Sequence, residues 1–425
     1  MMRVFKFGGA SIKDADSIRN VASIVRRYNS DQLTIIISAS GKTTNAMEEV
    51  LTAYWKKQTS EMKACLDKVK KNHKQIMDDL FDTAQHAIYS EVHDIFVDLD
   101  WILEEEPQDE FDYLYDQIVS TGELLSTKIV SAYLNEIGLA TTWLDVRDCI
   151  RTDNTYRDAN INWQETEAAI QARVPALMAK GLVVTQGFLG GTTENFTTTL
   201  GREGSDFTAA IFSYCLDAQD MSIWKDVPGV LTADPRLFDD TELVEQLSYA
   251  EAIEMTYYGA QVIHPKTIRP LQNKKIPLYV KSFVNPEGVG TAIGAFDITE
   301  YPPMIVVKKN QALLRMVSKD FFFVDEAKFS KLFEALANRR IKVNMTQNTA
   351  LAFSVCVNDV PNKINQLVAD LEANYEVEKI ENLKLVTIRH SSAKLFDQIV
   401  GERKIFLEEK IGSNIQLVMG KDEVL

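Results

Sequence analysis

The chain has 425 residues, of which 45% are hydrophobic and 25% are charged, and its formal net charge is −15 at pH 7. This length predicts two or three globular domains, and the acidic balance disfavours nucleic acid and anionic membranes as partners. Because the chain has four scattered cysteines, no signal-peptide pattern and no apolar run long enough for a membrane helix, we expect a cytoplasmic protein with reduced thiols.

Short apolar strands alternate with helical stretches through the first 300 residues. The expected strands cover residues 3–7, 33–38, 182–186, 221–226 and 277–282. Their continuous apolar runs are typical of strands buried on both faces of a parallel sheet. One helix is expected to begin near Asp14 and another near Ser205. This alternation predicts an α/β fold with a mainly parallel sheet covered by helices.

Residues 46–118 differ from their surroundings, because they are polar and carry apolar side chains at helical spacing. We interpret them as a long helical insertion with little chemistry in it. Its three histidines, His73, His86 and His93, lack the spacing of metal ligands and are expected to lie on helix surfaces. We therefore expect no metal site built from protein side chains.

Glycine and proline cluster in residues 285–303, where the pattern restarts. This boundary predicts one domain over residues 1–300 and a second over residues 301–425. The expected elements of the second domain are a strand, helix, strand, strand, helix and strand over 304–317, 326–339, 341–347, 351–357, 361–374 and 376–389. A further helix and two apolar stretches suggest a second, shortened unit of similar α+β kind.

Several motifs lie at or near predicted strand ends, where open α/β sheets build their sites. In KFGG, Gly8 and Gly9 would let the backbone approach a phosphate, and Lys6 is either a surface charge or a phosphate ligand. In SASGKTTN (38–45), small hydroxyl residues either cap a helix or receive an anion at its N-terminus. In STGE, Glu123 either complements a helix dipole or holds a substrate ammonium.

Two longer motifs follow in the same part of the chain. TTTLGREGSDFTAA (197–210) contains Arg202, which could grip a carboxylate, and Ser205 and Asp206, which either cap a helix or order Lys6. WKDVPGVLTADPR (224–236) is either a solvated loop or a nucleotide cradle whose arginine points toward phosphate.

Taken together and in this order, KFGGAS, SASGKTTN, STGE, TTLGREGSD, DVPGVLTADPR and YGAQVIHP (258–265) resemble the signatures of the aspartate kinases of the amino-acid kinase family. The resemblance covers residues 2 to about 295, and the tail resembles the ACT modules that follow this catalytic domain. It implies ATP-dependent phosphorylation of the side-chain carboxylate of L-aspartate to 4-phospho-L-aspartate, which starts lysine, threonine and methionine synthesis. Mg²⁺ would be bound with ATP.

The resemblance also implies a role for each matching residue. Lys6 would stabilise charge on the transferring phosphoryl group, and Asp206 would order Lys6. The residues implied to contact the nucleotide are Gly8, Gly9, Ser38, Lys225, Asp226 and Arg236. The residues implied to bind aspartate are Thr44, Glu123, Phe188, Arg202 and Ser205, with Glu123 at the ammonium and Arg202 at a carboxylate.

The chain departs from the family pattern at several positions. Leu231 replaces a tyrosine and Gln261 replaces a lysine near the nucleotide, and Lys225 could restore the lost charge. Glu203 replaces a glycine beside Arg202. In the tail, Asn344 stands where an aspartate that would meet an effector's ammonium is frequent, which puts feedback by lysine or threonine in doubt.

Two other functions remain open at this point. The chain is either an aspartate kinase or a non-catalytic member that binds an amino acid through its ACT region as a regulatory or assembly partner. A kinase for another small acidic amino acid shares the first motif but explains Glu123 and Arg202 less well. Because ACT units commonly pair edge strands across chains, we expect a homodimer or a larger assembly, with a possible amino-acid effector at the ACT region.

Overall fold

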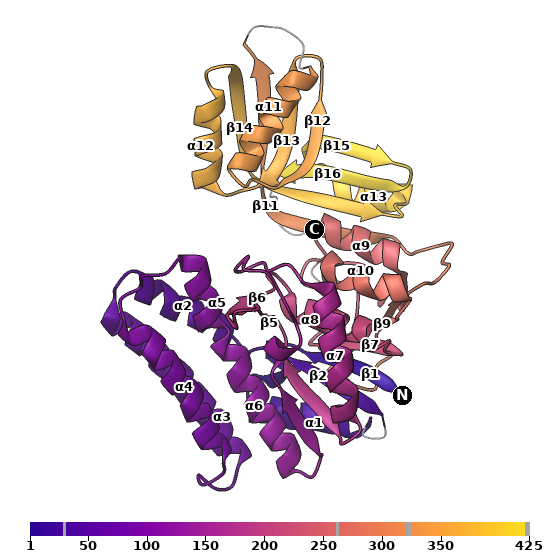
Figure 1. The fold of residues 1–425 in the computed structure, drawn as a ribbon. Coiled ribbons are helices and arrows are strands. Elements are labelled where there is room, and N and C mark those ends of the chain that lie inside the picture. The colour runs from indigo at the N-terminus through magenta and orange to yellow at the C-terminus, as the bar shows by residue number, and fades with distance from the viewer. Residues whose placement is uncertain (29–30, 261–262, 320–324, 421–425) are drawn as a thin grey trace. The chain divides into compact units, whose positions relative to one another are not determined.

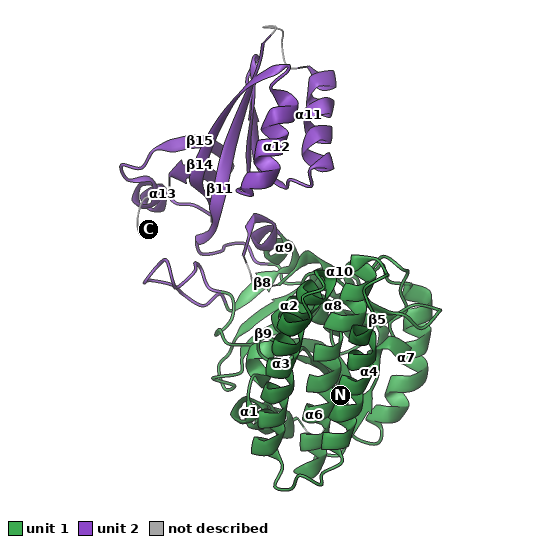
Figure 2. Ribbon diagram, turned by 90° about the vertical axis from the view of Figure 1, so that its left-hand side faces the viewer, with its two compact units in different colours: residues 1–230, 245–253, 262–297 green, residues 231–244, 254–261, 298–425 purple. Residues whose placement is uncertain are grey.

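The computed structural model describes residues 1–28, 31–260, 263–319 and 325–420. These residues form two compact units (Figure 2). Unit 1 comprises residues 1–230, 245–253 and 262–297, and unit 2 comprises residues 231–244, 254–261 and 298–425.

Unit 1 is built on an eight-stranded sheet with the order β3-β4-β2-β1-β7-β9-β10-β8. All neighbouring strands pair in parallel except β9 and β10, which are antiparallel. The strands are β1 Met2–Phe7, β2 Gln32–Ile37, β3 Thr141–Leu144, β4 Leu182–Gln186, β7 Asp220–Lys225, β8 Gln246–Ser248, β9 Leu278–Ser282 and β10 Thr291–Gly294. A separate antiparallel pair joins β5 (Leu189–Gly191) to β6 (Thr197–Thr199).

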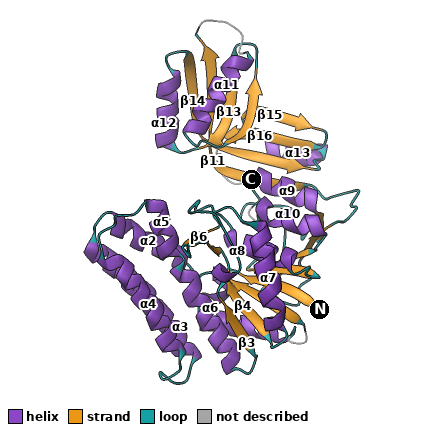
Figure 3. Cartoon of the chain, in the orientation of Figure 1, coloured by secondary structure: helices purple, strands orange, loops and turns teal. Residues whose placement is uncertain are grey.

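Helices surround this sheet, and α6, α7 and α8 contact its strands (Figure 3). The helices of unit 1 are η1 Gly9–Ile12, α1 Ala15–Arg26, α2 Thr43–Trp55, α3 Thr59–Leu80, α4 Ile88–Glu104, α5 Phe111–Val119, α6 Thr121–Glu136, η2 Val146–Asp148, α7 Trp163–Met178, α8 Gly204–Cys215 and α10 Pro265–Lys274. Helix α9 (Tyr249–Tyr258) has residues in both units. Four of these helices, α2 to α5, contain most of residues 46–118 (Figure 1).

The central strands are buried on both faces, as their apolar runs predict. Phe5 and Phe7 on β1 are almost fully buried and contact Trp224 on β7, and the rings of Phe7 and Trp224 stack with centroids 5.9 Å apart. Helix α1 begins after Asp14, which accepts a hydrogen bond from the backbone N–H of Ser17, the usual N-cap contact. Strands β1 and β7 each carry a lysine at or next to the carboxyl end, Lys6 and Lys225.

Unit 2 contains a six-stranded antiparallel sheet with the order β12-β13-β11-β14-β16-β15. Its elements are β11 Met304–Ser318, α11 Glu326–Asn338, β12 Val343–Asn348, β13 Ala352–Asn358, α12 Pro361–Leu371, β14 Tyr375–Arg389, α13 Ala393–Val400, β15 Ile405–Ile411 and β16 Asn414–Gly420. The chain order is therefore βαββαβ followed by a shorter αββ unit. Helices α11 and α12 pack their buried leucines on β11 and β13.

The predicted fold class is confirmed: a mostly parallel α/β sheet with helices is followed by an α+β region with the expected element order. The five predicted strands of unit 1 agree with the observed ones to within one residue. Strands β3, β8 and β10 were not predicted, because three or four residues are too few to show a periodicity.

Three further observations bear on the sequence-based expectations. His73 is buried rather than at a helix surface, and its Nδ1 lies 2.9 Å from the Val69 carbonyl oxygen. The four cysteines all lie in the described residues, where each is buried and none forms a disulfide. Among the helices that the structure describes, none combines the length and the hydropathy that a membrane span requires.

Candidate active site

A cavity of about 480 Å³ opens in unit 1 beside the carboxyl ends of β1, β2 and β7 and the N-terminus of α8. Its volume is in the range of small-molecule sites. The lining contains Lys6, Ser38, Thr44, Tyr115, Glu123, Arg157, Phe188, Gly201, Arg202, Glu203, Gly204, Ser205, Asp206 and Lys225. Nine of the thirteen residues that the sequence selected are in this list, although they come from six separate segments of the chain.

Two lysines converge on one carboxylate in this cavity. The Lys6 Nζ lies 2.7 Å from one oxygen of Asp206, and the Lys225 Nζ lies 3.8 Å from the other. Lys6 and Asp206 are 8% and 3% exposed, so the charges are close to fully buried. Burial alone would raise the pKa of Asp206, but the ammonium groups of Lys6 and Lys225 outweigh this effect and hold the pKa below its ordinary value. Asp206 is therefore a carboxylate at neutral pH, and it fixes both ammonium groups.

The glycines after β1 allow a close approach of two backbone segments. A Cβ atom on Gly9 would lie 2.7 Å from the carbonyl oxygens of Ala39 and Gly41, so no other residue fits there without a shift. The Gly41 N–H donates a hydrogen bond to the Gly9 carbonyl, which ties the loop after β1 to the loop after β2. A Cβ atom on Gly8 would lie 3.4 Å from Lys6 Nζ, so the glycine leaves space beside the ammonium group.

Glu123 lies in the first turn of α6 and is 2% exposed. One carboxylate oxygen accepts a hydrogen bond from the Ala39 N–H at 3.3 Å, and the other has no partner among the described residues. Burial raises the pKa of Glu123 to about 8, although the hydrogen bond from Ala39 opposes the shift. The buried carboxyl group is therefore neutral at pH 7, and its unpaired oxygen suits a cationic group of a ligand once the proton is released.

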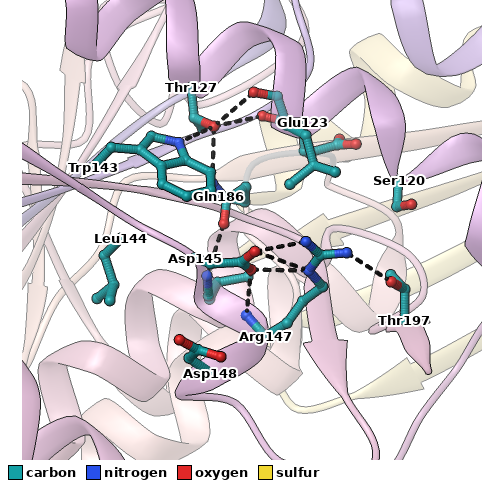
Figure 4. Close-up of polar contacts among 12 residues, drawn as sticks. Ser120, Glu123, Thr127, Trp143, Leu144, Asp145, Arg147, Asp148, Gln186 and Thr197 are labelled. Atoms are coloured by element: carbon teal, nitrogen blue, oxygen red, sulfur yellow. Dashed lines mark hydrogen bonds and ion pairs between the residues drawn. The ribbon is translucent and has the colours of Figure 1, made fainter. Parts of the chain in front are cut away.

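A buried network holds the first turns of α6 in place (Figure 4). The Thr127 hydroxyl accepts hydrogen bonds from the indole N–H of Trp143 and the side-chain amide of Gln186, and it donates to the Glu123 carbonyl at 2.8 Å. The Gln186 amide oxygen in turn accepts the Val146 N–H. Strands β3 and β4 thereby anchor the helix turn that carries Glu123.

Three more predicted residues, Phe188, Arg202 and Ser205, lie at or near the N-terminus of α8. Ser205 is buried against Gly187, where a Cβ atom would lie 2.4 Å from the Ser205 Cβ. The Phe188 N–H donates to the Thr208 hydroxyl, which keeps Phe188 against the same helix. Arg202 is exposed and forms no ion pair within the described ranges, so its guanidinium is available to a ligand. Ser38 and Thr44 complete the predicted set in the cavity lining.

Five residues of the lining were not among the predicted site residues. Gly201, Glu203 and Gly204 lie within the motif of residues 197–210, whereas Tyr115 and Arg157 lie in none of the motifs. Tyr115 belongs to α5, so one residue of the interval 46–118, which we expect to carry little chemistry, lies in the cavity wall. Helix α5 precedes α6 directly, which brings Tyr115 near Glu123 in the lining. Arg157 lies in a loop with no periodic pattern, and its place in the site depends on tertiary contacts alone.

Four predicted residues are not part of the lining. Gly8 and Gly9 lie next to it in the chain, as described above, and Asp226 is exposed at the end of β7. Arg236 belongs to unit 2, where its guanidinium is paired with Asp234 at 2.8 Å. Gln261 lies outside the described residues.

The comparisons with known proteins agree with this geometry. Residues 1–282 match the model of the amino acid kinase family. Lysine-sensitive aspartokinase 3 of Escherichia coli is 30% identical over 400 residues, which are 91% of this chain and 86% of the relative.

Two crystal structures of E. coli aspartokinase III are similar in fold. The structure in complex with aspartate and ADP has a TM-score of 0.83 at 28% identity and covers 99% of this chain and 96% of its own. The structure in complex with lysine and aspartate has a TM-score of 0.84 at 27% identity and covers 100% and 97%. This chain therefore belongs to the amino acid kinase family and, within it, to the aspartokinases.

Proposed function

We propose that the cavity of unit 1 is the place where this aspartate kinase transfers the γ-phosphoryl group of ATP to the side-chain carboxylate of L-aspartate. The product is 4-phospho-L-aspartate, which begins the route to lysine, threonine and methionine. The observation that carries the proposal is the position of the Lys6–Asp206–Lys225 cluster in the same cavity as Glu123 and Arg202. The cavity thus offers cations for phosphate, a carboxylate for an ammonium group and a guanidinium for a carboxylate.

We assign the phosphoryl group to the two lysines. Asp206 contacts both ammonium groups, and Lys6 and Lys225 both line the cavity. There they would stabilise the equatorial oxygens of the transferring group. Of the two lysines, Lys6 is the more buried, and we assign it the role of stabilising the transition state.

We assign the amino acid to Glu123 and Arg202, which line the same cavity. The unpaired oxygen of Glu123 would accept the substrate ammonium, and the guanidinium of Arg202 would bind a carboxylate. Thr44, Phe188 and Ser205 would complete the pocket around the substrate. An aspartate held between these groups would present its side-chain carboxylate to Lys6.

The nucleotide is assigned to the glycine loop and the end of β7. Gly8 and Gly9 would bring backbone N–H groups near the phosphates, and Ser38 and Lys225 would contact them from the neighbouring strands. Asp226 and Arg236 remain proposed nucleotide contacts on the basis of the resemblance. Lys6, Lys225 and the N-terminus of α8 suit phosphate, and Mg²⁺ is expected to enter as MgATP because it usually binds phosphates with few protein ligands.

This arrangement requires no protein nucleophile. The substrate carboxylate itself attacks the γ-phosphorus, and ADP leaves with the electrons of the broken P–O bond. The tasks left to the protein are to align the two substrates, to neutralise charge and to exclude water. Positioning of this kind supplies a large part of the rate enhancement in phosphoryl transfer.

A coupled assay for ADP release with MgATP and L-aspartate tests the proposal. We expect turnover that depends on L-aspartate and is much weaker with L-glutamate. Turnover with another acidic amino acid and none with aspartate would contradict the substrate assignment.

For unit 2 we propose regulation and assembly, with residues 301–425 as an ACT-like regulatory domain after a catalytic domain over residues 1–300. The E. coli relative has been crystallised with lysine. In this chain the Asn344 side chain already bonds Lys308, Gln311 and Asn358, so an ammonium effector at this position would have to displace Lys308. Titration of the activity with lysine and threonine tests for an effector. Light scattering tests for the homodimer or larger assembly that the edge strands β12 and β15 would support.

A further inference from the structure

We propose that Arg157 acts with Arg202 to bind the α-carboxylate of aspartate, the carboxylate that does not react. Arg157 would thereby favour substrates that have a free α-carboxylate. This inference rests on the proposed function. It concerns a residue that the sequence motifs do not include.

The backbone of Arg157 has an unusual conformation. Its φ angle is +69°, a region that glycine enters readily and arginine rarely. The conformation is held because the Arg157 N–H donates to both oxygens of Asp116, at 3.2 and 3.0 Å, and Asp116 is fully buried. Asp116 also accepts hydrogen bonds from the N–H and the hydroxyl of Thr199. An arginine at a strained position in a cavity wall indicates that its side chain is used there.

Three side chains of α5 support the guanidinium of Arg157. Its Cζ lies 4.5 Å from the centre of the Tyr115 ring and 5.9 Å from that of Phe111, and Nη1 donates to Asp112 at 3.0 Å. The side chain is 47% exposed, and in the part of the chain that is described Nε and Nη2 have no hydrogen-bond partner. The tyrosine thus fixes the plane of the group, and its free N–H groups remain available to a planar anion.

The cations of the cavity fall into two pairs. Lys6 and Lys225 meet at Asp206, whereas Arg157 lies next to the loop that carries Arg202. A Cβ atom on Gly201 would lie 2.6 Å from a carboxylate oxygen of Asp158 and 3.2 Å from the Arg157 carbonyl oxygen, which shows how closely the two loops pack. The lysine pair therefore marks the phosphoryl side, and the arginine pair marks another side of the same cavity.

The chemistry of aspartate indicates which of its groups the arginine pair would bind. The reacting carboxylate of aspartate must reach the phosphoryl group at Lys6, and the ammonium group goes to Glu123. The α-carboxylate is the group that remains, and guanidinium groups bind carboxylates in a bidentate, planar geometry. Two guanidinium groups at this point would select against ligands that lack the second negative charge.

The chain offers a closely matched control at Glu203. Glu203 lines the same cavity, its φ angle is +56°, and one carboxylate oxygen is buried without a hydrogen-bond partner among the described residues. Replacing either residue by glycine relieves a left-handed backbone, but the two changes remove opposite charges. If the change in the backbone weakens aspartate binding, both glycine variants should bind aspartate more weakly than the wild type. If the loss of positive charge weakens it, only Arg157→Gly should do so.

The experiment compares the wild type with Arg157→Gly, Arg157→Lys and Glu203→Gly. For each protein, KM and kcat are measured with L-aspartate, with the α-amide of L-aspartic acid and with MgATP. We expect Arg157→Gly to raise KM for aspartate about tenfold or more, the effect of losing a charge-assisted pair. The kcat/KM for the α-amide and the KM for ATP are expected to stay within about twofold of the wild type.

Arg157→Lys is expected to fall between the wild type and Arg157→Gly, and Glu203→Gly to have a KM for aspartate no higher than the wild type. A rise in KM for ATP instead of aspartate would overturn the inference, and so would equal losses with aspartate and its α-amide. Thermal melting checks folding, and Arg157→Gly should melt no lower than the wild type because glycine suits the backbone.

Different experimental results would contradict the role of Arg157 and the proposed function. A wild type that turns over aspartate normally, together with an Arg157→Gly variant that matches it, would remove only the role of Arg157. A wild type without aspartate-dependent turnover would remove the proposed function. In that case calorimetric titration of L-aspartate into the wild type and Arg157→Gly would still decide whether Arg157 binds the amino acid.

Discussion

Each unit of this protein contains a lysine with several polar partners. Lys6 in unit 1 is buried and Lys308 in unit 2 is half-buried, and the two clusters differ in their surroundings. In unit 1, Lys6 and Lys225 share one carboxylate, that of Asp206, beside an open cavity. In unit 2, Lys308 donates to the Tyr257 carbonyl and to the Asn344 side chain. The Asn344 amide donates in turn to Gln311 and Asn358.

The difference separates a binding site from a structural network. The cluster in unit 1 lines a cavity in which one oxygen of Glu123 has no hydrogen-bond partner among the described residues. Such an arrangement costs folding free energy that a ligand can recover on binding. The cluster in unit 2 pairs its donors with acceptors inside the fold, which indicates a role in stabilising the sheet.

The largest expected effect comes from Lys6→Ala. Removing the ammonium group should lower kcat for aspartate phosphorylation by roughly 10²–10³-fold, by analogy with the loss of a group that stabilises developing charge. Lys308→Met is the matched control and should leave kcat unchanged. The measurement is steady-state ADP release at saturating substrates. Similar activities for the two variants would remove the distinction between the clusters.

The second expected effect is the pH dependence of aspartate binding that Glu123 produces. Because burial raises the pKa of Glu123 to about 8, the empty pocket holds a neutral acid at pH 7, whereas a bound ammonium group needs the carboxylate. Binding then releases a proton, so the Kd for aspartate should fall about tenfold per pH unit as the pH rises toward 8 and then level off. Calorimetry at several pH values measures this, and Glu123→Gln should bind weakly without that pH dependence. A wild type whose Kd is flat between about pH 6.5 and 8.5 would contradict the assignment.

A smaller effect is expected from Asn344→Ala in unit 2. The change removes one acceptor from Lys308 and one donor from Gln311 and Asn358, so the free energy of unfolding should fall by about 1–3 kcal/mol. Urea unfolding followed by circular dichroism measures the change. The kcat with aspartate should be that of the wild type, and a loss of activity with no loss of stability would argue against a structural network.

The last expected effect is the pH dependence of stability that Lys308 produces. Burial lowers the pKa of Lys308 from its ordinary 10.5 to about 8, so between these values the folded state binds fewer protons than the unfolded state. The free energy of unfolding contributed by this residue therefore increases as the pH rises from about 8 to 10.5. The melting temperature of the wild type should rise relative to Lys308→Met over this range, and a fall would show that the ammonium group is favourably paired.

Much of the fold and most of the site follow from local sequence patterns. The strands of unit 1 are readable because both faces are buried, and parallel strands bring their carboxyl ends, with Lys6, Ser38 and Lys225, to one edge. Glu123 and Asp206 lie in the first turns of helices, where position alone also fits a helix cap, so their selection depended on the resemblance to the aspartate kinases.

The rest depends on tertiary contacts that no short pattern reports. Arg157 enters the cavity because Asp116, 41 residues earlier, holds its N–H and because Tyr115 lies under its guanidinium. The sequence does not mark Asp116 as a functional residue, because a single carboxylate on a helix is usually exposed to solvent. The raised pKa of Asp116, about 6 and caused by burial, becomes visible only in the folded chain.

The central claim is tested most directly by trapping the acyl phosphate. The wild type is incubated with MgATP, L-aspartate and hydroxylamine, and aspartyl hydroxamate is measured beside a parallel incubation of Lys6→Ala. The account predicts hydroxamate that depends on both substrates in the wild type and is close to background in Lys6→Ala. Hydroxamate formation that is equal in the two proteins, or absent from the wild type, would contradict it.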